Sequence, residues 1–139
     1  MNKIYIFFGL FLLTSCSPSD IPPEGLEERQ GVYYEVNSQI PYSGPIEVYH
    51  ENGQLRFKGN YKDGKREGPF ESYHDNGQLD IKVNFKDDKQ EGPEVGYSDN
   101  GKLCSEGNYK EGKPDGFFEF YCPKGREYYK DGEGTVLLF

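Results

Sequence analysis

The sequence repeats itself with a period of 24 residues, and this repetition limits what the chain can fold into more than any other feature. Tyrosine marks the period at Tyr49, Tyr73, Tyr97 and Tyr121. An Asn-Gly step begins three residues after each of the first three tyrosines. A fixed period is typical of repeat architectures, in which each copy packs on the next. We predict copies at residues 49–72, 73–96 and 97–120, with partial copies at 31–48 and 121–139, in one repeat domain over 31–139.

Within each copy, apolar and polar residues alternate. In the second copy Leu79, Ile81, Val83 and Phe85 are separated by single polar residues, which predicts a β-strand with one apolar and one solvated face. The Asn-Gly steps and Asp63-Gly64 tolerate the positive φ angles of tight turns, so each copy reads as a hairpin. Residues 31–139 show no sustained helical periodicity. We therefore predict an all-β fold, a single-layer antiparallel β-meander built from hairpins.

The repeat also resembles a known family. The pattern Y-x-x-N-G-x-L, then N-Y-K-D-G-K, then a glycine occurs here at residues 49–55, 60–65 and 68. It is similar to the MORN repeat (membrane occupation and recognition nexus), in the variant form found in bacteria. Many proteins of this kind are labelled YwqK-family antitoxins. Two residues depart from the pattern in the second copy: Asp88 replaces a turn glycine, and Val83 replaces the glycine found at 59 and 107. These departures predict slightly different packing there.

The N-terminal residues predict export. Residues 4–13 are mostly apolar but too short to span a bilayer as a helix, as in a signal peptide. The following Leu-Thr-Ser-Cys resembles the bacterial lipobox, which implies removal of residues 1–15 and lipidation of Cys16 with chains such as palmitate. Ser17, by the same resemblance, implies sorting to the outer membrane. Residues 16–30 then read as a flexible tether. We expect a lipoprotein anchored in the bacterial cell envelope, at the outer membrane; an ordinary cleaved signal peptide is the alternative.

Composition and motifs argue against several classes of function. The net charge of −8 disfavours binding to nucleic acid or to anionic lipid surfaces, so we expect membrane contact through the lipid anchor only. His50 and His74 share a repeat position, but two strand spacings would separate them by roughly 9–10 Å. We interpret them as solvated turn residues rather than metal ligands. Nucleophile, phosphate-binding and zinc motifs are missing from the sequence. We expect no enzyme activity, no catalytic residue, no metal and no cofactor.

The cysteines at 104 and 122 stand where the other copies have different residues, which suggests that they form a pair. If opposed residues of the two strands sum to 226, Cys104 faces Cys122 within reach of a disulfide. A register one residue different, summing to 225, would place them on opposite faces, and the aromatic pattern does not decide between the two. An oxidising compartment favours the bridge.

The function predicted from the sequence is binding. We expect a non-catalytic repeat module that recognises another protein, with Tyr49, Tyr73, Tyr97 and Tyr121 as candidate exposed contacts. The family label implies an alternative, an immunity or antitoxin protein that neutralises a toxin. A second alternative is a module that binds cell-wall carbohydrate through exposed aromatic rings.

Overall fold

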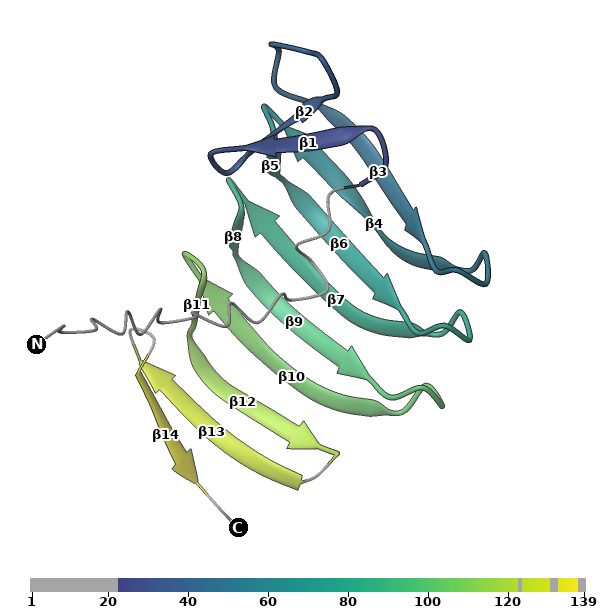
Figure 1. Ribbon diagram of the computed structural model, residues 1–139. Coiled ribbons are helices and arrows are strands. Elements are labelled where there is room, and N and C mark those ends of the chain that lie inside the picture. Colours follow the sequence, from purple (N-terminus) through teal and green to yellow (C-terminus); the bar gives the residue numbers. More distant parts are fainter. Residues whose placement is uncertain (1–22, 123, 131–132, 138–139) are drawn as a thin grey trace, which may run out of the picture.

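The computed structural model describes residues 23–122, 124–130 and 133–137 (Figure 1). Within these ranges the chain forms 14 β-strands and no helix, which confirms the all-β prediction. The strands are β1 Leu26–Arg29, β2 Val32–Glu35, β3 Gly44–Tyr49, β4 Leu55–Lys62, β5 Lys65–Arg66, β6 Gly68–Tyr73, β7 Leu79–Lys86, β8 Lys89–Gln90, β9 Gly92–Tyr97, β10 Leu103–Lys110, β11 Lys113–Pro114, β12 Gly116–Tyr121, β13 Lys124–Lys130 and β14 Glu133–Leu137.

The repeats form one antiparallel meander, in the order β3-β4-β6-β7-β9-β10-β12-β13-β14. A long strand in each copy pairs with the strand before it across the Asn-Gly turn, and its far end pairs with a two-residue strand, β5, β8 or β11. The turn between β4 and β5 consists of Asp63 and Gly64, with φ angles of 51° and 75°. Positive φ at both central residues is what a type I′ hairpin turn requires. The predicted hairpin meander is therefore confirmed.

A β-bulge interrupts every copy just after the Asn-Gly turn. In the second copy Tyr73 pairs with Leu79 but Ser72 pairs with Ile81, so Asp80 has no partner on β6. The pairing shifts in the same way around residues 56 and 104. A bulge breaks the alternation of faces, and Asp80 and Ile81 consequently both line the concave groove described below, whereas Leu79 does not. The strict alternation predicted from Leu79 onward is wrong at this point.

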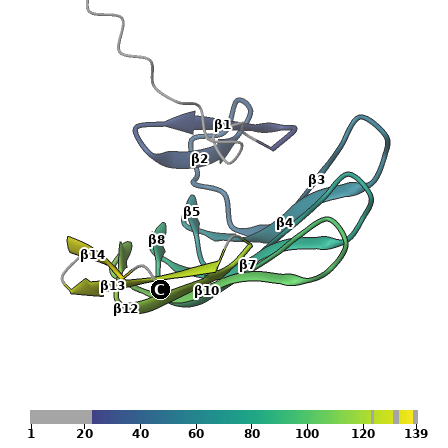
Figure 2. The same cartoon turned by 90° about the horizontal axis from the view of Figure 1, so that it is seen from below.

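The core lies on one face of the repeat sheet. Its buried members are Ile46, Tyr61, Phe70, Val83 and Phe85. The rings of Phe70 and Phe85 meet edge to face with centroids 5.1 Å apart, and those of Tyr61 and Phe70 with centroids 6.1 Å apart, the geometry that aromatic quadrupoles favour. Figure 2 shows that the sheet is bent and that its concave side faces the β1–β2 hairpin.

The β1–β2 hairpin forms a separate two-stranded sheet. It is attached to the repeats through Tyr33, whose backbone N–H donates to the carbonyl of Gly64 at 2.9 Å and whose ring lies 4.8 Å from that of Tyr61. The predicted tether over 16–30 is thus wrong for Leu26–Arg29, because these residues pair with β2 and Leu26 packs against the core. The predicted partial copy at 31–48 joins the repeat sheet only from β3 onward, so the single layer holds for the repeats alone.

Candidate functional site

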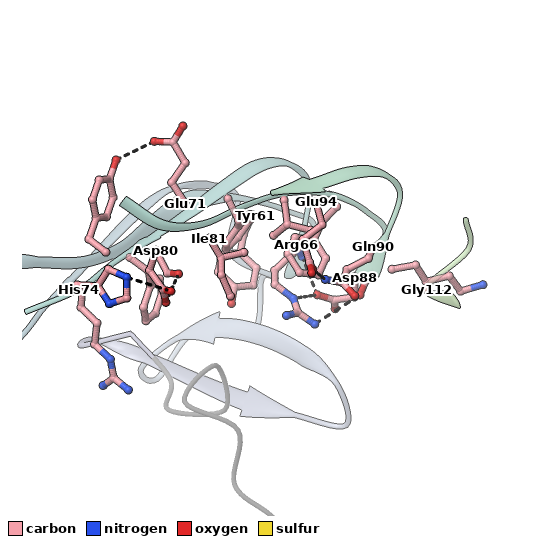
Figure 3. Close-up of a pocket in the computed structure, with 18 of the residues that line it drawn as sticks. Tyr61, Arg66, Glu71, His74, Asp80, Ile81, Asp88, Gln90, Glu94 and Gly112 are labelled. Atoms are coloured by element: carbon pink, nitrogen blue, oxygen red, sulfur yellow. Dashed lines mark hydrogen bonds and ion pairs between the residues drawn. The ribbon is translucent and has the colours of Figure 1, made fainter. Parts of the chain in front are cut away.

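A groove of about 940 Å³ lies on the concave face of the sheet. Figure 3 shows the β1–β2 hairpin opposite the groove residues. The groove crosses the first and second copies and reaches Gly112 of the third. Its apolar and aromatic lining consists of Phe57, Tyr61, Phe70, Tyr73, Ile81, Val83 and Phe85. A concave apolar site with a few polar groups is typical of a ligand or partner site.

Glu94 interrupts the row of apolar residues on this face. Equivalent positions in the other copies hold Ile46, Phe70 and Phe118, which are only 6%, 8% and 5% exposed. Glu94 is partly buried and lines the groove. Glu94 is absent from the site residues expected from the sequence, although an alignment of the copies shows a carboxylate where the neighbouring copies have phenylalanine.

Val83 explains how the sheet accommodates Glu94. A Cβ at Gly59 would lie 2.5 Å from the ring of Phe70, and a Cβ at Gly107 would lie 2.3 Å from the ring of Phe118. In both outer copies the phenylalanine therefore covers a glycine. In the second copy, Val83 occupies the glycine position. Glu94 occupies the phenylalanine position next to it. The altered packing predicted for the second copy thus has a physical cause, because the smaller acidic side chain leaves room for a valine.

Among the described side chains, the carboxylate of Glu94 has a hydrogen-bond partner but no ion-pair partner. Gln90 Nε2 donates to Glu94 Oε2 at 2.9 Å. In residues 23–122, whose side chains are described, no Lys, Arg or His nitrogen lies within 4.0 Å of the Glu94 carboxylate. Burial raises the pKa of Glu94, and the hydrogen bond from Gln90 opposes that effect. The site consequently holds a partly desolvated carboxylate that has no counter-ion in residues 23–122.

Asp88 and Arg66 form an ion pair in the same groove. Asp88 Oδ1 accepts hydrogen bonds from the Arg66 backbone N–H and from Nε, both at 2.9 Å. The guanidinium also lies 4.2 Å from the centroid of the Phe85 ring, a cation–π contact. Asp88 adopts a φ of 67° at its turn, a region that aspartate tolerates better than most residues. The departure at Asp88 therefore joins two successive copies.

His50 and His74 also connect successive copies. Their Nε2 atoms lie 2.8 Å from the carbonyl of Tyr73 and 2.9 Å from that of Tyr97. A carbonyl only accepts, so both Nε2 atoms donate. The interpretation of these histidines as solvated is corrected, since both are partly buried. Among the described residues, no group of three or more His, Cys, Asp or Glu side chains is arranged to hold a metal.

Three of the four candidate tyrosines, Tyr49, Tyr73 and Tyr121, contact glutamates. Tyr49, 55% exposed, donates to Glu47 at 2.5 Å, and the hydroxyl of Tyr121, 38% exposed, lies 2.6 Å from a Glu106 oxygen and 2.7 Å from a Glu119 oxygen, to either of which it can donate its one proton. Tyr73 and Tyr97 are partly buried. The hydrogen bonds to carboxylates raise the pKa of the Tyr49 and Tyr121 hydroxyls. A binding role for these four tyrosines stays a prediction.

Glu71 lies at the centre of a charged cluster. Tyr73 donates to it at 2.7 Å, and Lys58 and Lys82 approach it at 3.0 and 3.2 Å. The Tyr73 hydroxyl, followed by Lys58, lowers the pKa of Glu71 to about 2. Figure 3 shows Glu71 on the side of the sheet away from Asp80. The two faces of the sheet thus differ where the first and second copies meet, with paired charges on one face and the groove on the other.

Cys104 and Cys122 are joined in a disulfide, with Cα atoms 4.8 Å apart. The strands nevertheless follow the register that sums to 225, since Ser105 pairs with Phe120. The expectation that this register would separate the two cysteines is wrong, because Cys104 is the bulge residue opposite β9 and does not follow strict alternation. Cys16, the predicted lipidation site, lies outside the described residues.

The fold and groove define a class of protein, an open β-sheet repeat protein with a groove on its concave face. Residues 42–63, 66–87 and 90–111 match the MORN repeat variant. The chain therefore carries three consecutive MORN repeats of the variant type. MORN repeats are commonly protein- or membrane-binding modules, and the family is generally non-catalytic.

Comparison with individual proteins adds little. No curated protein sequence matches the chain. Among solved structures, it is similar to a chain in the crystal structure of the GtfA/B complex bound to UDP and GlcNAc, with 12% identity and a TM-score of 0.41. The match covers 86% of this chain and 25% of that one. This likeness is too weak to support an argument about function.

Proposed function

We propose that the protein is a non-catalytic protein-binding module, held at the bacterial cell envelope by lipid on Cys16. The observation that carries the proposal is the groove on the concave face, which combines an apolar floor with charged side chains. This combination fits the core-and-rim chemistry of protein interfaces better than it fits a flat lipid surface. The net charge of −8 also disfavours direct contact with anionic lipid.

The one Ser-His-Asp grouping in the groove lacks the geometry of a hydrolase. Ser72 Oγ donates to Asp80 at 3.2 Å, and His74 Nε2 lies 3.4 Å from the same carboxylate. A catalytic triad needs the histidine bonded to the serine so that it can take the hydroxyl proton. Here His74 Nε2 already donates to the Tyr97 carbonyl. The grouping supports a structural role, which agrees with a binding function.

The membrane anchor is part of the proposal because of the sequence before the fold. In the described residues, no helix is long and apolar enough to cross a membrane. A lipid on Cys16 would hold the sheet near the membrane through a short linker. Cys16→Ala should abolish palmitate labelling and release the protein from the membrane fraction. Full membrane retention of this variant without labelling would contradict the anchor.

Photocrosslinking in intact envelopes tests the binding function. A photoreactive residue would replace Ile81, which is 37% exposed and lines the groove, and a control would replace the exposed Asp99. We expect discrete protein adducts from position 81 and few from position 99. An adduct with a toxin whose toxicity appears when this protein is missing would identify an immunity protein. Adducts with glycan alone, or none, would contradict the proposal.

A further inference from the structure

We propose that Glu94 determines which partner the groove accepts, by forming an ion pair with a Lys or Arg side chain whose aliphatic stem lies along Val83 and Phe85. The inference rests on the proposed protein-binding function and specifies the chemistry of the partner. It assigns the recognition to one carboxylate in the second copy.

The partial burial of the Glu94 carboxylate costs free energy. A carboxylate loses hydration when it is partly buried, and a neutral amide donor replaces only part of that loss. The first and third copies avoid this cost with phenylalanine at the equivalent position. Because Val83 has changed together with Glu94, the sheet has adapted to the carboxylate. Departures from the local rules of a fold that carry such a cost are typical of functional sites.

The charges of the groove are complementary to a cationic side chain. The side chains of Asp88 and Arg66 neutralise each other, and Glu71 is paired with two lysines. When Glu71 on the opposite face is left out, three cations among the groove residues stand against four carboxylates. The cations are Arg56, Arg66 and Lys89, and the carboxylates are Asp75, Asp80, Asp88 and Glu94. The groove is therefore acidic apart from its two histidines, and a cationic group matches it.

The shape of the partner's side chain must also match the groove. Lysine and arginine combine a charged end with an apolar stem that packs along hydrophobic surfaces. The groove offers the matching arrangement, because Glu94 lines it together with Val83, Ile81 and Phe85. A small inorganic cation would gain nothing from this apolar floor. A neutral apolar side chain would leave the carboxylate buried and unpaired.

Short peptides test the inference on the complete lipidated protein in detergent micelles. The probes are Ac-Val-Lys-Val-NH2 and the same peptide with acetyl-lysine, followed by the amide signals of Val83, Gln90 and Glu94 in two-dimensional NMR. We expect the lysine peptide to shift these signals and to bind at least 10-fold more tightly than the acetylated one. Glu94→Gln, nearly isosteric and uncharged, should remove that difference.

The control is Asp99→Asn, which removes one negative charge from an exposed turn outside the groove. It should leave binding of the lysine peptide unchanged. Equal loss in both variants would mean that only net charge matters, and unchanged binding in Glu94→Gln would overturn the inference. No shift at the groove signals would overturn it as well. Failure of the protein-binding function itself would appear separately, as missing protein adducts from position 81.

Discussion

The second and third copies of the repeat depart from the common pattern in different ways. The second has Val83 and Glu94 where the third has Gly107 and Phe118. The third has a disulfide cysteine, Cys104, at its bulge, where the second has Asp80. The second copy has a carboxylate in the groove where the third copy buries an aromatic ring. The third copy has a covalent link to its neighbouring strand.

The comparison shows that residues that depart from the repeat pattern occur in interacting pairs. Val83 belongs with Glu94, Cys104 is bonded to Cys122, and Asp88 is bonded to Arg66. Arg66 itself is replaced by Gln90 and Pro114 in the following copies. A residue that changes on one strand alters the space or charge that its neighbour meets, so the neighbour changes too.

Removing the disulfide should produce the largest change in stability. Replacing Cys104 and Cys122 by serine should lower the free energy of unfolding by about 3 kcal/mol, the chain-entropy value for a loop of this size. Denaturant unfolding of the oxidised wild type and the variant measures the difference. Reduction of the wild type is the matched control and should give a similar loss. Equal stability of all three forms would show that the link contributes nothing.

The second-largest loss of stability should come from placing the second copy's valine in the third copy. Gly107→Val brings a side chain against the buried ring of Phe118, and we expect a loss of about 1–3 kcal/mol, as for other overpacked cores. Adding Phe118→Glu completes the exchange. The double variant should lose less than the sum of the two single changes, as measured by a double-mutant cycle. Strict additivity would contradict the coupling between these positions.

The repeated part of the fold could be predicted from the sequence because local signals agree there. Alternation gives strands, and Asn-Gly or Asp-Gly gives turns. The bulge could not be predicted, since no special residue type marks it: Arg56, Asp80 and Cys104 all occupy it. The β1–β2 hairpin was missed because a four-residue strand after prolines carries little periodicity, and its stability depends on tertiary contacts such as that between Tyr33 and Tyr61.

The site was less predictable than the fold. Asp88, Val83 and the two cysteines could be recognised as departures by alignment of the copies, and so could Glu94. The groove itself depends on the bend of the sheet and on which side chains the bulge turns inward. The sequence alone does not determine either, so the tyrosines were chosen as candidate contacts instead.

The two faces of the sheet should respond oppositely to acid, with smaller effects. Glu71 has a lowered pKa of about 2, so the stability it contributes is present above the ordinary glutamate pKa and is lost as the pH falls from about 5 towards 2. We expect a loss of about 0.5–1 kcal/mol, as for exposed ion pairs. Glu94 has a raised pKa, so its protonation favours the folded state as the pH falls through that value.

Unfolding measured between pH 7 and pH 2 separates these contributions. Glu71→Gln should reduce the loss of stability at acidic pH. Glu94→Gln should remove the gain of stability that protonation of Glu94 provides. Asp99→Asn serves as the exposed control in both cases. Identical pH profiles for wild type and Glu71→Gln would contradict the role of the Glu71 cluster.

The most direct test of the account converts the second copy into its neighbours. Val83→Gly combined with Glu94→Phe restores the glycine under a phenylalanine that both outer copies use. Titration of this variant with Ac-Val-Lys-Val-NH2, followed by NMR, measures binding, and its unfolding curve reports the fold. The account predicts a protein at least as stable as the wild type that no longer binds the lysine peptide. A stable variant that binds the peptide as tightly as the wild type would contradict it.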